Sequence, residues 1–148
     1  MKKIIVVLMV IIIAVASYFT FIRPTTFTFG EILSDTMEDI NNLEGGEVIR
    51  HIDIRRIHTP NNGNSQEYEY IQIDDEEKID KLIKDVTDMK LNRKDENPDV
   101  GYFISIKTNH SNYDLILGLE DILWIDGTSY EIIGENKLLE IVSSLNYE

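Results

Sequence analysis

Residues 102–133 read YFISIKTNHSNYDLILGLEDILWIDGTSYEII, and their pattern indicates the fold class. Apolar and polar residues alternate over 102–107 and 113–119, which is the period of a half-buried strand. Two shorter apolar segments then flank the dipeptide Asp126-Gly127, which favours a tight hairpin turn. Four short strands joined by short turns are expected to pair antiparallel.

Helical patterns lie on both sides of these strands. Thr28 and Glu31 have the spacing of a capping box, which predicts that a first helix begins there. A second helix is predicted over 74–90 with Asp74 as its N-cap, because apolar residues recur there at helical spacing. The same spacing predicts a third helix over 137–145.

Two more strands are predicted at 47–57 and 66–73, on either side of the turn cluster TPNNGNS. The order is therefore helix, two strands, helix, four strands, helix. This order predicts an α+β fold, with an antiparallel sheet of about six strands and helices packed on one face. Trp124 is expected to be buried against these helices.

The N-terminal residues 4–22 read IIVVLMVIIIAVASYFTFI and carry no charge. As a helix they would rise about 28 Å, close to the thickness of a bilayer core. They therefore predict a single-pass transmembrane signal-anchor over 1–23, followed by one extracytoplasmic domain over 24–148. Lys2 and Lys3 place the N-terminus in the cytoplasm, because positive residues favour that side.

A cleaved signal peptide is the alternative interpretation of the same segment. Ala14-Val15-Ala16 has the form of a cleavage site, and cleavage after Ala16 would release a secreted domain. The apolar segment continues through Phe19, Phe21 and Ile22, which favours the uncleaved anchor.

Composition excludes several classes of function. The chain carries 27 acidic and 14 basic residues, and its net charge is −13. Such a charge repels phosphate backbones, so nucleic acid is excluded as a partner. The chain has no cysteine, which excludes disulfides, a thiol nucleophile and a cysteine-based zinc site.

No catalytic, cofactor-binding or metal site is predicted. The three histidines lack a metal-binding spacing, and no phosphate-binding or nucleophile motif is present. The loop residues Asp95, Asn97 and Asp99 have part of the spacing of a calcium loop. However, the glycine is one position late and residue 106 is not acidic, so an ordinary acidic loop is favoured.

A binding surface is the remaining candidate site. Tyrosines recur on the strand at 66–73, and arginines are clustered on the strand before it. Aromatic and arginine side chains are enriched where proteins bind other molecules. The candidate surface residues are Tyr68, Tyr70, Arg50, Arg55 and Arg56, although core filling and surface ion pairs also account for such residues.

Three segments of the chain resemble a known family. They are the start MKKIIVVLMVIII, the helix entry IDDEEKIDKLI and the hairpin ILWIDGTSYEII. They resemble an uncharacterised family of small membrane-anchored extracytoplasmic proteins of Bacillus-like Gram-positive bacteria. The resemblance implies a membrane location and an α+β fold, and it supplies no activity and no site residues.

The predicted function is a membrane-anchored, extracytoplasmic and non-catalytic binding or regulatory module. Its partners would be the membrane, through residues 4–22, and an extracytoplasmic protein, peptide or wall component. A secreted inhibitor-like binder and a small hydrolase are the alternatives. No cofactor is expected, and the absence of a recognisable nucleophile, metal set or acid–base pair makes the enzyme the weaker interpretation.

Overall fold

The computed structural model describes residues 9, 11–12, 26–38, 47–58 and 67–147. Its strands are β1 (Thr26–Thr28), β2 (Ile49–His58), β3 (Glu67–Ile73), β4 (Lys90–Arg93), β5 (Val100–Thr108), β6 (Asn112–Gly118), β7 (Ile122–Ile125) and β8 (Thr128–Ile133). The helices with described bounds are α2 (Phe29–Glu38), α3 (Glu76–Val86) and α4 (Lys137–Ser144).

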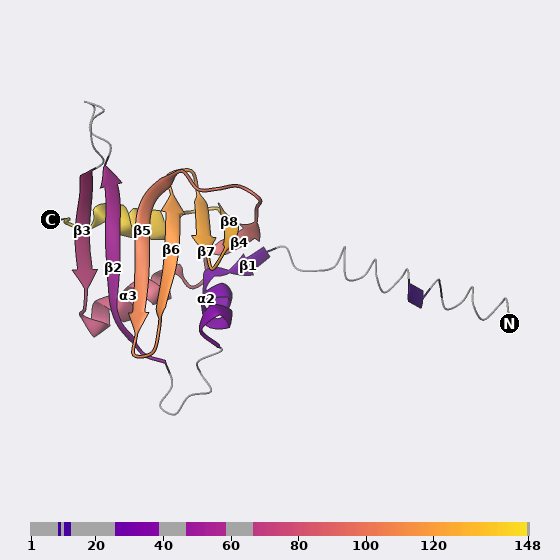
Figure 1. Ribbon diagram of the computed structural model, residues 1–148, viewed down its shortest axis with the longest axis horizontal. Coiled ribbons are helices and arrows are strands. Elements are labelled where there is room, and N and C mark those ends of the chain that lie inside the picture. Colours follow the sequence, from indigo (N-terminus) through magenta and orange to yellow (C-terminus); the bar gives the residue numbers. More distant parts are fainter. Residues whose placement is uncertain (1–8, 10, 13–25, 39–46, 59–66, 148) are drawn as a thin grey trace.

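The strands form one eight-stranded sheet in the order β1-β4-β8-β7-β6-β5-β2-β3. Every neighbouring pair is antiparallel. Strands β5 to β8 follow one another as a meander, and β2 joins the free side of β5 (Figure 1). The two edges of the sheet are therefore β1 and β3.

The turn between β7 and β8 has the geometry that its sequence predicts. Asp126 has a φ of 44° and Gly127 a φ of 77°, so both central residues are left-handed. Two left-handed residues are the signature of a type I′ turn, whose twist matches that of the flanking strands. The hairpin prediction at Asp126-Gly127 is confirmed.

The helix starts follow the capping chemistry of the sequence. The backbone N–H of Thr28 donates to the Glu31 carboxylate at 2.7 Å, and the N–H of Glu31 donates to the Thr28 hydroxyl at 3.2 Å. This reciprocal pair confirms the predicted capping box. Helix α3 begins one residue later than predicted, because Asp75 rather than Asp74 accepts the Lys78 N–H, at 3.1 Å.

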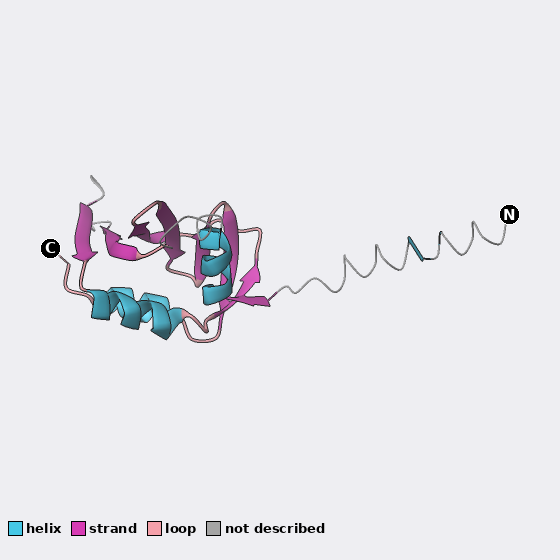
Figure 2. Cartoon of the chain, turned by 90° about the horizontal axis from the view of Figure 1, so that it is seen from below, coloured by secondary structure: helices cyan, strands magenta, loops and turns pink. Residues whose placement is uncertain are grey.

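One hydrophobic core lies between the helices and one face of the sheet, which we call the inner face (Figure 2). Each helix packs one apolar side into this core, and Phe29, Leu82 and Val142 are among the residues that do so. Alternate residues of the strands fill the other side, because successive side chains of a strand point to opposite faces. The fully buried strand residues are Ile52, Ile54, Ile106, Leu91, Leu115, Leu117 and Leu123.

The predicted fold class is contradicted in the number of strands. The prediction of about six strands missed β1 and β4, and it assigned Lys90 to a helix and residues 92–101 to a loop. These strands have only three and four residues. They form because β4 pairs with the edge of β8 and β1 then pairs with β4. Such long-range pairing leaves no periodic signal in the local sequence.

The prediction of a transmembrane helix, with the single-pass signal-anchor description, is also contradicted. Among the described residues, no helix is long and apolar enough to cross a bilayer. The longest, α3, has 11 residues, and a span needs about 20. Of the predicted segment 4–22, only Met9, Ile11 and Ile12 are described, and the other residues lie outside the described part of the chain.

Two leucines near the end of β6 test the inner face. Leu117 is fully buried and Leu119 is 57% exposed. We expect Leu117→Ala to lower the free energy of unfolding by about 2–5 kcal/mol, because it leaves a cavity in the core. Leu119→Ala is the matched control, with an expected change within about 0.5 kcal/mol. Equal losses in urea unfolding would contradict the burial of Leu117 in this core.

Candidate functional site

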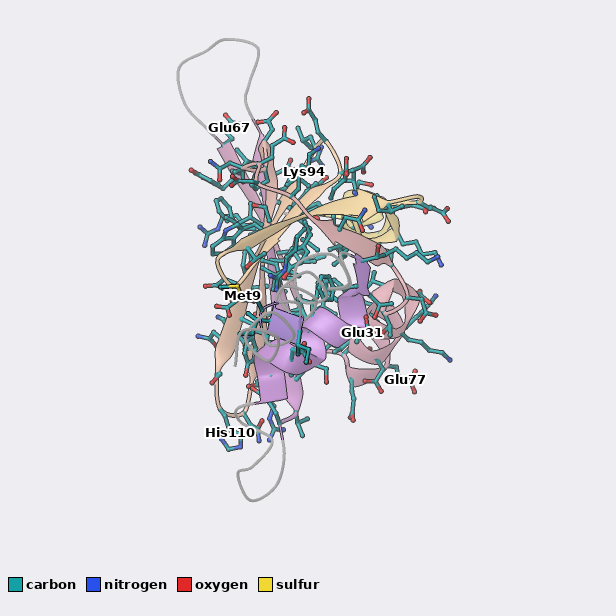
Figure 3. All side chains as sticks on the ribbon, turned by 90° about the vertical axis from the view of Figure 1, so that its right-hand side faces the viewer. Met9, Glu31, Glu67, Glu77, Lys94 and His110 are labelled. Atoms are coloured by element: carbon teal, nitrogen blue, oxygen red, sulfur yellow. The ribbon has the colours of Figure 1, made fainter. Side chains whose placement is uncertain are left out.

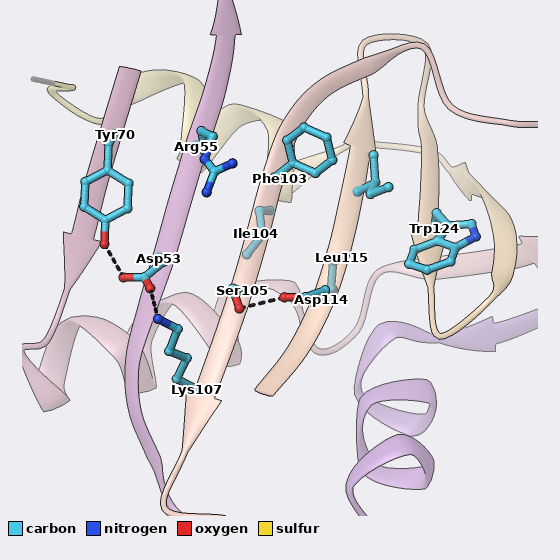
Figure 4. Close-up of a pocket in the computed structure, with 11 residues that line it drawn as sticks. Asp53, Arg55, Tyr70, Phe103, Ile104, Ser105, Lys107, Asp114, Leu115 and Trp124 are labelled. Atoms are coloured by element: carbon cyan, nitrogen blue, oxygen red, sulfur yellow. Dashed lines mark hydrogen bonds and ion pairs between the residues drawn. The ribbon is translucent and has the colours of Figure 1, made fainter. Parts of the chain in front are cut away.

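The face of the sheet turned away from the helices, which we call the outer face, carries one row of large side chains across five strands. The row consists of Tyr70 on β3, Arg55 on β2, Phe103 on β5, Ile116 on β6 and Trp124 on β7. Each is the direct cross-strand partner of the next. We call these five residues the aromatic row, and Figure 4 shows Tyr70, Arg55, Phe103 and Trp124 on their strands, with helices behind.

Trp124 therefore lies on the face opposite to the one predicted. Its neighbours Leu123 and Ile125 are buried in the inner core, and alternation along β7 turns the indole outward. The prediction that Trp124 packs against the helices was wrong, because the period of a strand does not tell which of its two faces is covered.

Polar side chains form a second row beside the aromatic row. Asp53, Ser105 and Asp114 are cross-strand partners on β2, β5 and β6. Asp53 accepts hydrogen bonds from the Tyr70 hydroxyl and from Lys107 Nζ, both at 2.6 Å. The Ser105 hydroxyl donates to Asp114 at 2.7 Å (Figure 4). These contacts fix the positions of the polar groups.

Asp53 is the best-connected titratable group on this face. Burial alone would raise its pKa, but hydrogen bonds from Lys107 and Tyr70, with the charges of Lys107 and His51, together lower the pKa below its ordinary value. The hydrogen bond to Asp53 in turn raises the pKa of Tyr70. The carboxylate is thus held ionised and the phenol protonated, so both act as fixed hydrogen-bonding groups.

The outer face is shallowly hollowed between these two rows. The hollow has a volume of about 460 Å³ and is lined by side chains of both rows together with Lys107. Its charged lining residues are two acids, Asp53 and Asp114, and two bases, Arg55 and Lys107. The hollow is therefore neutral overall, although the chain has a net charge of −13.

The connection between β4 and β5 bounds this face at one end. A Cβ atom at Gly118 would lie 3.1 Å from the Pro98 side chain, so glycine allows the connection to pass close to β6. The N–H of Leu119 donates to the Asp99 carbonyl at 3.0 Å. At the base of the connection, Lys94 contacts Glu96 at 2.8 Å and Glu131 at 3.2 Å.

The structure brings together three of the five predicted surface residues. Tyr70 and Arg55 belong to the aromatic row, and Tyr68 lies beside them with the Arg55 guanidinium 5.9 Å from its ring centre. Arg56 lies on the opposite face, where it contacts Glu69 at 3.4 Å and the Tyr147 ring at 5.7 Å. Arg50 is exposed at a register shift of β2, apart from this set.

Sequence reasoning missed most of the face. The sequence gives no facing direction for Phe103 and Ile116, its prediction for Trp124 was wrong, and it did not single out Asp53 and Lys107. The alternation of polar and apolar residues in β5 (Val100–Thr108) indicates part of this face, because the polar residues Ser105 and Lys107 mark the solvent-exposed side of the strand. Phe103 shares that side, which makes it an aromatic residue on a solvated face.

No metal centre is found in the described ranges. They contain no group of three His, Cys, Asp or Glu side chains placed to hold an ion. Asp99, from the loop that resembles a calcium site, uses its carbonyl to bind β6. His51 lies 3.8 Å from Asp53, and His110 lies in the turn between β5 and β6 (Figure 3).

The polar groups of the outer face are held by contacts within the protein. The Ser105 hydroxyl donates to the Asp114 carboxylate at 2.7 Å, whereas an activated serine nucleophile usually donates to a histidine. The ionised Asp53 is held by a lysine and a phenol, which weakens it as a base. Rings and fixed polar groups on a rigid sheet are instead the elements of a recognition surface.

Comparisons with known proteins identify no relative. No protein-family model matches the chain, and neither curated proteins nor solved structures give a significant match. The resemblance to a family of Bacillus-like bacteria stays a prediction. Function is therefore inferred from the outer face alone.

Asp53→Asn tests the hydrogen-bond network. At neutral pH we expect it to lower the free energy of unfolding by about 1–2 kcal/mol, because hydrogen bonds to a charged group are lost. A carboxyl group whose pKa is lower in the folded state stabilises the protein at pH values above its ordinary pKa. The difference should therefore shrink as the pH falls below the ordinary value of 3.8 towards the lowered pKa.

Urea unfolding at several pH values measures this difference. Asp85→Asn, at an exposed position of α3, is the control and should change stability little at any pH. A loss for Asp53→Asn that stays constant down to the lowest accessible pH would contradict the network.

Proposed function

We propose that the chain is a non-catalytic binding module whose ligand lies on the outer face of the sheet. One observation carries the proposal: the aromatic row crosses five strands on the face that the described helices leave open. Location outside the cytoplasm, and a protein, peptide or wall component as partner, stay predictions from the sequence.

Exposure of the rings supports the proposal. Tyr70 is 44% exposed and Phe103 is 36% exposed. An antiparallel sheet with one solvated face usually carries polar residues there. Apolar rings grouped on a protein surface and bordered by polar groups mark sites of interaction, because their contact with water is unfavourable.

Fixed geometry supports it further. The Tyr70 ring is held through its hydroxyl by Asp53, which Lys107 holds in turn. Side chains that are already ordered lose little conformational entropy when a ligand binds. Strands also hold their side chains more precisely than loops do. The outer face is thus prepared for a ligand before the ligand arrives.

The same contacts support a non-catalytic role. Both carboxylates of the hollow, Asp53 and Asp114, are engaged by hydrogen-bond donors from the protein. A surface of this kind recognises a ligand and leaves it chemically unchanged.

Nuclear magnetic resonance of the full chain tests this proposal. Soluble oligosaccharides, extended peptides and small aromatic acids are added as separate probes. We expect any probe that binds to shift the Trp124 indole N–H resonance and the amides of 53–55, 103–105 and 114–116. Trp124→Ala should abolish the amide shifts, whereas Leu119→Ala should leave them unchanged.

Two results would contradict the binding module. One is that bound probes shift only resonances of α3 and α4, which would place the site on the helical side. The other is conversion of a probe to a product during the experiment, because turnover requires a catalytic site.

A further inference from the structure

We infer that the ligand of the outer face is a single extended chain of β-linked sugars, lying across the strands along the aromatic row. The inference rests on the proposed function, and it names the class of ligand. Its starting point is the regular placement of three rings in one row.

The rings lie on alternate strands of the sheet. Tyr70 is on β3, Phe103 on β5 and Trp124 on β7, and Arg55 and Ile116 occupy the strands between them. Because neighbouring strands are about 4.8 Å apart, the backbone positions that carry consecutive rings are about 9.6 Å apart. This spacing matches the disaccharide repeat of an extended β-linked hexose chain, so one ring meets every second sugar.

The orientation of the rings fits the apolar faces of sugars. In Figure 4, which looks onto the outer face, the rings of Tyr70 and Phe103 are seen broadly from the front and the Trp124 indole more obliquely. A hexose in its stable chair presents axial C–H groups on a face, and these pack on the electron-rich face of an aromatic ring. The row thus offers three stacking positions.

Sheet twist selects a single chain over a crystalline surface. Neighbouring strands are rotated by roughly 20–25°, so consecutive rings of the row are turned by about 40–50° relative to each other. Rings turned in this way do not lie in one plane, and a flat crystal face would touch only one of them. A separate glycan chain twists about its own axis and follows the row.

Polar groups are placed to bind the sugar hydroxyls. The polar row of Asp53, Ser105 and Asp114 lies about 7 Å further along the strands, which is two residues from the aromatic row. Arg55 stands within the aromatic row, between Tyr70 and Phe103, and supplies several N–H donors. A chain stacked on the rings therefore has acceptors and donors along its side.

Charge favours a neutral ligand. The hollow has two acidic and two basic lining residues, and the chain as a whole has a net charge of −13. A polyanion would be repelled by the protein, and a polycation would find no excess of negative charge in the hollow. A neutral polymer of hydroxyl groups and C–H faces matches both the balance of charge and the mixed lining.

The experiment titrates the full chain with four probes and follows Trp124 emission, which reports on this row because the chain has one tryptophan. Chitohexaose and cellohexaose are extended β-linked chains. Maltohexaose is the α-linked control, whose curved chain does not keep the spacing, and a proline hexapeptide represents an extended peptide. We expect the two β-linked probes to bind and maltohexaose to bind at least tenfold more weakly.

Variants locate the binding. Phe103→Ala removes the central ring and should weaken chitohexaose binding roughly fivefold, because a ring contact contributes about 1 kcal/mol. Phe103→Tyr keeps the ring and should keep binding, and Leu119→Ala should change nothing. Thermal unfolding of each variant shows whether Phe103→Ala is folded, and calorimetric titration of the Phe103→Tyr chain decides the case if it is not.

Each alternative outcome overturns a different part of the inference. Equal binding of maltohexaose overturns the β-linked class and keeps the outer face. Binding of the peptide alone, lost in Phe103→Ala, overturns the glycan and keeps the binding module. Glycan binding that Phe103→Ala leaves unchanged places the glycan elsewhere and overturns the inference. Failure of all four probes to change Trp124 emission or release heat overturns the glycan inference, and the separate resonance experiment then decides the binding module.

Discussion

The structure depends on the pairing of β5 with β2 on one side and β6 on the other. Each residue of β5 has a fixed partner on each neighbouring strand. If the pairing slipped by one residue, every side chain of the strand would turn to the other face. With Ile104 paired to Ile54 and Leu115, the inner face is continuous and apolar. The same register places Phe103 between Arg55 and Ile116 on the outer face. Core and candidate site are thus two consequences of one constraint.

The helices explain why only one face is closed. Helix α2 follows β1, α3 follows β3 and α4 follows β8, and all three place their apolar sides in the same core. No described element returns to cover the central strands on the other side, where only the connection between β4 and β5 passes over the end of β6. The face that carries the aromatic row stays open because all three helices with described bounds pack on the other face.

The outer face combines two kinds of groups that are rarely exposed together. Rings gain free energy when they leave water, whereas charged groups lose it unless they find partners. Here both carboxylates of the hollow are already engaged within the protein, Asp53 by Lys107 and Asp114 by Ser105. A ligand can therefore cover the rings without removing an unpaired carboxylate from water. This division of roles favours binding of a neutral, hydroxyl-rich molecule.

Local signals in the sequence predicted the parts of the fold that local chemistry determines. The capping box of Thr28 and Glu31 and the Asp126-Gly127 turn need only neighbouring residues, and both were found. The short strand β4 depends on the distant edge of β8, so the pattern around Lys90 was read as a helix. The candidate site depends on register across β3, β2, β5, β6 and β7. Tyr70 and Arg55 were noticed as residue types, but nothing near them in sequence showed that Phe103 and Trp124 continue the same row.

The most direct test of this account uses cysteine labelling, which is possible because the chain has no cysteine of its own. Single variants Phe103→Cys, Ile104→Cys, Ser105→Cys and Ile106→Cys are exposed to a thiol reagent in native buffer, and the labelling rates are compared. The account predicts fast labelling at 103 and 105 and strong protection at 104 and 106, because successive side chains alternate between the open and the closed face. Similar rates at all four positions, or protection at 103 and 105, would contradict the register and with it the open outer face.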